Sequence, residues 1–143
     1  MQPRRQSMVA VLLALCLALS ACAKSSESEA SGNGPAKLVE TANPDVQQVV
    51  LTEKAATRLD IQMTATTGFA GAAIIPYASV VYDADGAAWA YTSPKPLTFV
   101  RTPITVASID GDEAHLSAGP ASGTEVVTVG TAELFGTEQG IGQ

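Results

Sequence analysis

The sequence predicts a mainly β fold: a small β-roll or barrel-like domain with one or two short helices, placed after a signal peptide and a flexible linker. Three observations predict it. Residues 74–129 alternate apolar and polar side chains with the period of a strand. Clusters of Gly, Pro and Asp interrupt this alternation at 83–86, 110–112 and 119–123. Only about 95 residues remain to build a core outside the leader and the polar stretch that follows it.

The N-terminus has the pattern of an export signal. Two arginines precede an apolar run that is too short to span a bilayer comfortably. The run ends in Leu19-Ser20-Ala21-Cys22, which resembles the lipobox of bacterial lipoproteins. The resemblance implies a signal peptide over residues 1–21, a lipid on Cys22, and attachment to a cell membrane on its extracytoplasmic face. The alternative is an ordinary secretory signal cut after Ala21, with Cys22 as a stray thiol.

The two cysteines support lipidation. Cys16 lies in the segment that is removed, and Cys22 carries the lipid, so the mature domain has no thiol for a disulfide or a metal site. Residues 22–45 are rich in Ser, Glu, Gly and Asn, which bury too little apolar surface to order a chain. We therefore expect a lipidated cysteine and a disordered linker over 22–45, the β domain over 46–136, and a flexible, Gly-rich tail over 137–143.

The charge balance argues against one class of partner. The whole chain has a net charge of −6, and removal of the two signal-peptide arginines leaves 6 basic and 14 acidic residues, a net charge of −8. This balance argues against nucleic acid as a partner, because phosphate binding needs a basic patch.

The elements expected before residue 74 form one compact unit. A strand over 46–51 leads to Thr52, which is a plausible N-cap for a short helix ending near Leu59. A second strand over 60–66 places Ile61, Met63 and Ala65 on one face, toward the core. If this strand completes the core, a chain cut at residue 74 leaves an unstable fragment.

The later strands follow from turn chemistry. Strands over 79–82 and 88–91 flank the turn at 83–86, and the turn at 110–112 separates a strand over 98–106 from one over 114–118. A last strand covers 125–129, and a short helical or extended lid covers 131–135. In the strand over 98–106, Phe99 and Arg101 share the face opposite Val100 and Ile104.

No residue pattern carries catalytic chemistry. Asp83 and Asp85 precede a Gly, but a calcium loop of the EF-hand type needs a Glu where Thr92 stands, so these carboxylates belong to a turn. His115 is the only histidine and is expected on the surface. Met63 is interpreted as a core residue rather than a copper ligand. The sequence thus predicts no enzyme, no catalytic residue, no cofactor and no metal site.

A family resemblance adds a role. It rests on apolar, aromatic and glycine positions in a fixed order: Ile75-Pro76, Ser79 to Asp83, Trp89-Ala90-Tyr91, Phe99 to Val106, Ala118-Gly119, Gly123, Val126-Val127 and Gly130 to Leu134. With the lead-in over 51–62, this order resembles the C-terminal membrane-proximal domain of periplasmic adaptors, also called membrane-fusion proteins, of bacterial efflux systems. The resemblance implies a small β-roll to which both ends of the chain contribute and which docks on an inner-membrane transporter.

One departure from the family limits the role. Between Thr66 and Ala73, where a full adaptor inserts a lipoyl domain and a long helical hairpin, this chain has only six residues. The expectation is therefore a lipid-anchored, adaptor-like accessory protein that docks on a membrane transporter. The alternative is a stand-alone extracytoplasmic lipoprotein that binds a small ligand or metal ion.

Overall fold

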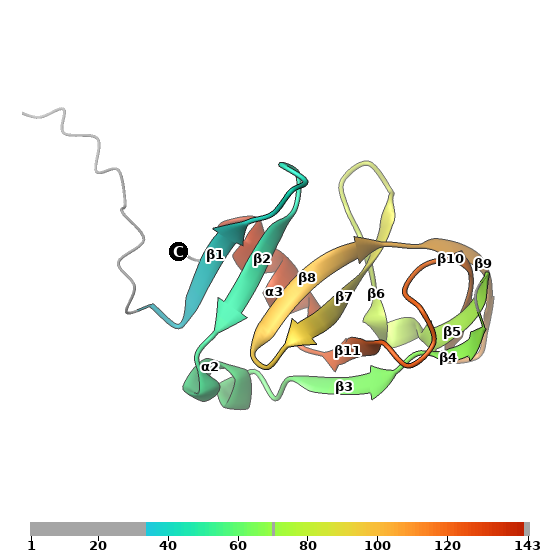
Figure 1. Cartoon of the computed structure of the whole chain (residues 1–143), viewed down its shortest axis with the longest axis horizontal. Helices are drawn as coiled ribbons and strands as arrows, with labels where there is room; N and C mark the ends of the chain where they lie inside the picture. Colours follow the sequence, from blue (N-terminus) through green and yellow to red (C-terminus); the bar gives the residue numbers. More distant parts are fainter. Residues whose placement is uncertain (1–33, 70, 142–143) are drawn as a thin grey trace, which may run out of the picture. The chain divides into compact units, whose positions relative to one another are not determined.

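The computed structural model describes residues 34–69 and 71–141, and this part of the chain is mainly β (Figure 1). Its strands are β1 (Ala36–Glu40), β2 (Gln47–Leu51), β3 (Gln62–Ala65), β4 (Thr67–Phe69), β5 (Ala72–Pro76), β6 (Val80–Tyr82), β7 (Ala88–Lys95), β8 (Thr98–Pro103), β9 (Thr105–Asp110), β10 (Glu113–Ala118) and β11 (Glu125–Val129). Its helices are α2 (Glu53–Arg58), α3 (Thr131–Glu138) and the single 3₁₀ turn η1 (Tyr77–Ser79).

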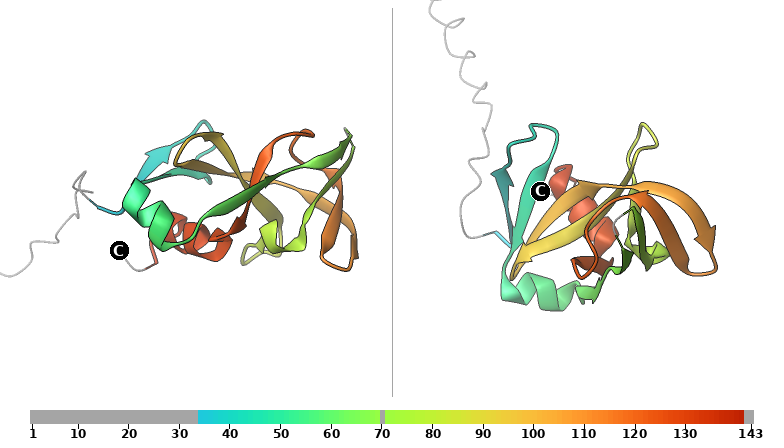
Figure 2. Two further views of the ribbon diagram at one scale, coloured as in Figure 1. Left: turned by 90° about the horizontal axis from the view of Figure 1, so that it is seen from below. Right: turned by 45° about the vertical axis from the view of Figure 1, so that its right-hand side comes forward.

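The strands form two antiparallel sheets. The larger sheet has seven strands in the order β1-β2-β8-β7-β11-β3, with β6 also pairing with β7. The smaller sheet has four strands in the order β4-β5-β10-β9. Figure 2 shows α3 lying along the larger sheet. Because the larger sheet ends at β1 and at β3, it is open and does not close into a barrel in the described part of the chain.

The central strands of the larger sheet are buried on both faces. Tyr91 of β7 and Val127 of β11 belong to one hydrophobic cluster, while their chain neighbours Ala90 and Val126 belong to a second cluster shared with the smaller sheet. Successive side chains of a strand point to opposite faces, so a strand covered on both faces needs consecutive apolar residues. This explains why β7 and β11 contain apolar pairs rather than strict alternation.

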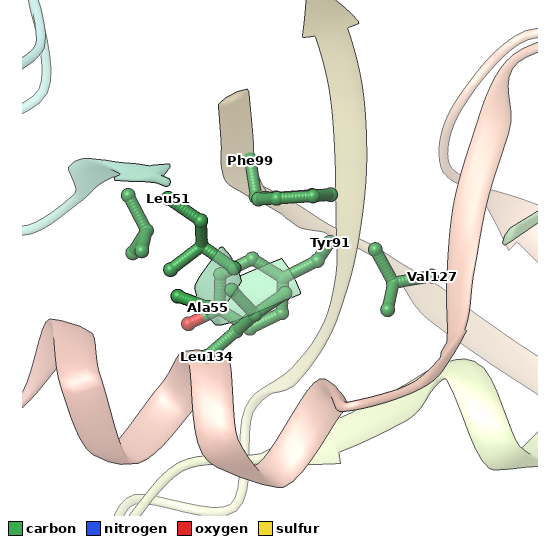
Figure 3. Packing of buried hydrophobic residues seen from close by; sticks show 7 residues of the cluster. Leu51, Ala55, Tyr91, Phe99, Val127 and Leu134 are labelled. Atoms are coloured by element: carbon green, nitrogen blue, oxygen red, sulfur yellow. The ribbon is translucent and has the colours of Figure 1, made fainter. Parts of the chain in front are cut away.

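The first cluster joins the larger sheet to both helices. Figure 3 shows Tyr91, Phe99 and Val127 in one cluster with Leu134 of α3, Leu51 of β2 and Ala55 of α2. The side chains of Tyr91, Val127 and Leu134 are fully buried. Each large apolar side chain buried in this way contributes about 1.5–3 kcal/mol of transfer free energy.

The strand, capped helix and strand predicted before residue 74 are found, and so is the first hairpin, but β2 and β3 do not form one compact unit because β8, β7 and β11 lie between them in the larger sheet. The Thr52 side chain accepts a hydrogen bond from the Ala55 amide at 3.2 Å and so caps α2, which ends at Arg58. β6 pairs with β7 in the register Val80 to Ala90, across the turn at 83–86. The turn at 110–112 and the strand over 125–129 are also found, and the expected lid is the helix α3.

The expected linker over 22–45 is wrong for residues 36–45. β1 pairs with β2 along its whole length, from Ala36 opposite Leu51 to Glu40 opposite Gln47. Ala36 and Leu38, two positions apart on one face of β1, pack against the first cluster. The reason is that β2 supplies an apolar neighbour, which a composition argument applied to the linker alone does not see. The earlier part of that linker, and the signal peptide, lie outside the described residues.

The expected flexible tail over 137–143 is wrong at its start. α3 continues to Glu138, whose side chain is buried against the larger sheet. The helix therefore joins the core through its last turn, and the domain does not end at residue 136.

Two predictions about individual strands also fail. Met63 was expected in the core but is 44% exposed, because β3 is the edge strand of the larger sheet and has a neighbour on only one side. Ile61 does pack against the first cluster. The strand expected over 98–106 is divided at Ile104 into β8, which belongs to the larger sheet, and β9, which belongs to the smaller one.

Candidate functional site

A buried polar cluster links β7, β8 and α3. Arg101 Nε lies 3.2 Å from Glu138 Oε1, and the side chains of these residues are only 6% and 1% exposed. The Tyr91 hydroxyl donates a hydrogen bond to Glu138 Oε2. The Gln47 amide donates to Glu138 Oε1 at 3.1 Å, so both carboxylate oxygens have donors from other elements.

The Arg101 guanidinium has three further contacts besides its ion pair with Glu138. Its Nη2 donates to the Asp45 carbonyl oxygen at 2.7 Å. The guanidinium carbon lies 4.3 Å from the centre of the Trp89 ring and 5.6 Å from that of Phe135. Such stacking over aromatic faces stabilises a cation that has left water. The cluster thus places the Arg101 guanidinium against one carboxylate, one carbonyl oxygen and two aromatic rings.

Burial sets the ionisation of the tyrosine in this cluster. Removal from water raises the pKa of Tyr91, and its hydrogen bond to the Glu138 carboxylate raises that pKa further. Tyr91 therefore keeps its proton and remains a donor. The role that follows is structural: the cluster fixes α3 against two strands and against the β1–β2 connection that contains Asp45.

Sequence reasoning missed this cluster for a specific reason. Arg101 was placed on the Phe99 face of its strand, which is the buried face, but its counter-ion lay in the expected tail. One signal was available: Leu134 and Glu138 are four residues apart and so share one face of a helix. A predicted helix that extends to Glu138 places the Glu138 carboxylate on the same face as the buried Leu134, toward the sheet.

Asp83 organises the turn between β6 and β7 rather than a metal site. Its Oδ1 accepts hydrogen bonds from the amides of Asp85 and Ala87, and its Oδ2 accepts one from Trp89 Nε1 at 2.8 Å. The bond from Trp89 is the main reason why the pKa of the Asp83 carboxyl lies below its usual range. Among the described residues no group of three or more His, Cys, Asp or Glu side chains could hold a metal ion.

The other residues considered in the sequence are dispersed. His115 is partly exposed on β10, on the face opposite the buried Ala114 and Leu116. The acidic residues of the β9–β10 turn, Asp110, Asp112 and Glu113, are exposed. Cys22 lies outside the described residues. No described helix is long and apolar enough to cross a membrane.

A groove of about 620 Å³ lies between α2, the start of β1 and the end of α3. Its apolar lining comes from Pro35, Ala36, Leu51, Ala55 and Leu59. Lys54 and Arg58 also line it, and both are exposed. This groove therefore combines apolar walls with two basic side chains.

No protein-family model, no curated protein and no solved structure matches the chain in the three comparisons.

Proposed function

We propose that this chain is a lipid-anchored, adaptor-like accessory protein that docks on a membrane transporter of an efflux system at the extracytoplasmic face. The observation that carries the proposal is the way in which the two ends of the domain meet. β1 and β2 from its beginning and β11 and α3 from its end share one sheet and one core. This arrangement supports the β-roll that the resemblance to periplasmic adaptors implies.

Residues 67–72 stand where a full adaptor has its lipoyl domain and helical hairpin, and their short length fits a protein that docks on a transporter without forming a channel. At the point where a full adaptor inserts its lipoyl domain and helical hairpin, β4 and β5 form a short hairpin with Phe69 opposite Ala72. Nothing in these residues extends toward a partner in another membrane. The proposed protein therefore acts at the transporter and leaves any channel to other subunits.

The outer face of the smaller sheet is the proposed docking surface. Ala73 and Ile75 of β5 point to the second cluster, so Ile74 and its cross-strand neighbours Thr67 and His115 point away from it. Phe69, on the same outer face, is 72% exposed. Phe69 is thus a large exposed apolar side chain on the same face as the partly exposed Ile74, and together they are the residues proposed for docking.

Co-purification from native membranes tests the docking role. The tagged full chain is crosslinked in its own cells, and the proteins that co-purify are identified. The Phe69→Glu variant should lose the transporter, while Met63→Glu, which adds the same charge to an exposed apolar residue of the other sheet, should retain it. Membrane fractions of a Cys22→Ser variant test the anchor separately, because loss of the lipid should release the chain.

The proposal fails if no transporter co-purifies with the wild-type chain, or if both glutamate variants retain it equally. A second function, a stand-alone binding lipoprotein, is favoured by the groove beside α2. In that case a medium-chain fatty acid such as decanoate should raise the Tm of the purified chain by mass action, with no dependence on Phe69.

A further inference from the structure

The groove beside α2 lies in a part of the surface that is set apart by its charge. Besides the end of α3, which contributes Thr137 to the groove, three segments meet there: residues 34–38, 51–61 and 94–98. The Thr52 amide donates to the Pro35 carbonyl oxygen at 3.0 Å, and the Leu51 amide donates to that of Leu97 at 2.9 Å. Figure 1 shows α2, the start of β1 and the β7–β8 turn at the same end of the described chain. These three segments are called the α2 end below.

Basic residues are concentrated at the α2 end although the domain as a whole is acidic. Four of its residues are basic, namely Lys37, Lys54, Arg58 and Lys95, and two are acidic, Glu53 and Asp60, for a net charge of +2. The remaining described residues contain one basic residue, the buried Arg101, and ten acidic residues, for a net charge of −9. An electric field of this polarity orients the domain in front of an anionic surface.

The two basic residues of the groove are arranged to act together. Lys54 and Arg58 are four residues apart on α2 and therefore share one face of the helix. Neither is in an ion pair with an acidic side chain of residues 34–69 or 71–141. The positive charges of Lys54 and Arg58 repel one another. An anion bound between them would offset this repulsion, which is unfavourable in the free protein.

The chain also enters the domain at this end. Gly34 and Pro35 line the groove, and eleven residues separate Gly34 from Cys22. The twelve Cα steps between them span at most roughly 40 Å. A lipid on Cys22 therefore keeps the α2 end within reach of the membrane that holds the anchor.

We propose that the α2 end is a docking surface for an anionic phospholipid bilayer, with Lys54 and Arg58 on the phosphate groups and the apolar groove against the acyl region beneath them. Anionic lipid attracts nearby basic side chains, and apolar area adds to that attraction at the interface. The proposal goes beyond docking on a transporter, although the proximity argument rests on the proposed anchor. It orients the domain with its acidic β9–β10 turn away from the lipid.

Fluorescence quenching by lipid tests the orientation. A fluorophore is attached in the full chain to Thr57→Cys, exposed on α2, or to Ser108→Cys, exposed on β9, and the chain without an added cysteine gives the background from Cys16 and Cys22. Vesicles carry a quencher on the lipid and consist of phosphatidylcholine alone or with about one third phosphatidylglycerol. We expect strong quenching at position 57 only, with anionic vesicles only, and its loss in about 0.5 M salt.

Matched charge variants test the residues. Lys54→Gln with Arg58→Gln lowers the net charge by two, and so does Thr105→Glu with Ala107→Glu on exposed positions of β9. The first pair should weaken the anionic-lipid effect about tenfold or more, and the second pair should change it little. Equal quenching at both labels, no effect of phosphatidylglycerol, or equal behaviour of the two pairs overturns the proposal. Because these vesicles contain no transporter, the result is independent of the co-purification experiment.

Discussion

The carboxylate of Glu138 holds the buried charges of this domain together. It accepts hydrogen bonds from a tyrosine, an arginine and a backbone amide that come from three different strands. Breaking a buried ion pair by removing one partner is strongly destabilising, since the other charge stays out of water without compensation. The stability of the domain therefore depends on a residue of the last helix.

Glu138→Ala should lower the free energy of unfolding by about 3–5 kcal/mol, because Arg101 is left buried without its counter-ion. Urea denaturation followed by circular dichroism measures this loss. Glu133→Ala is the matched control: the residue is exposed in the first turn of the same helix, and its loss should cost less than about 1 kcal/mol. Similar costs for the two variants would show that the buried pair is not needed.

Trp89 reports on Asp83, because it is the only tryptophan of the chain. The pKa of Asp83 is lowered from its ordinary value of 3.8, chiefly by the Trp89 hydrogen bond. A lowered folded-state pKa means that the contact stabilises the fold above the unfolded pKa and is lost as the pH falls through the folded one. We expect a change in Trp89 emission with a midpoint below pH 3.8, at constant circular dichroism.

Asp83→Asn should remove that acid transition, since an amide does not titrate. A midpoint at or above the ordinary pKa of aspartic acid in the wild-type chain would contradict the geometry of the turn.

At the scale of elements, the start of α3 depends on a glycine. Gly130 caps the helix with φ of +91°, and a Cβ at this position would meet the Cδ1 atom of Ile61. Gly130→Ala should therefore cost about 2–4 kcal/mol, from the left-handed backbone and from the clash together. Gly136→Ala, in the same helix with free space around it, should instead stabilise by about 0.5–1 kcal/mol.

A double-mutant cycle separates the two causes. Ile61→Val removes the atom that an added Cβ would meet, so it should recover the steric part of the Gly130→Ala loss and leave the backbone part. If Ile61→Val recovers nothing, the clash does not contribute.

Elements with local signals could be predicted from the sequence, and elements that depend on distant partners could not. Thr52 caps α2 within its own turn, and Asp83 shapes the turn that sets the register of Val80 against Ala90. β1 was missed because its five residues directly follow a long polar stretch and find their pairing partners in β2. Alternation gave the wrong environment for Met63, because it cannot tell an edge strand from a central one.

The same limit applies to the candidate sites. The charge pair of Arg101 and Glu138 joins residues 37 apart, and the groove joins α2 to a segment that composition assigned to the linker. No local pattern encodes either arrangement. Cys22 remains a prediction from the sequence alone.

At the scale of the whole molecule, residues 34–73 supply parts that the later strands need. β2 pairs with β8 and β3 pairs with β11, while Val49, Leu51 and Ala55 belong to the first cluster. A chain of residues 74–143 should therefore show no cooperative unfolding transition in urea, with the full chain measured beside it. The expectation is the one drawn from the sequence, but its reason lies mainly in β2 and α2 rather than in Met63.

Cooperative unfolding of residues 74–143 on their own would mean that the larger sheet is complete without its first strands.

Glu138 follows all of its partners in the chain, so it is the last of them to be added during biosynthesis. Before Glu138 is added, the Arg101 guanidinium has no carboxylate to pair with when it is buried. The strands β7 and β8 and the loop that contains Asp45 also lack the complete α3 that packs against them. The buried ion pair between α3 and β8 therefore cannot form until Glu138 has been added.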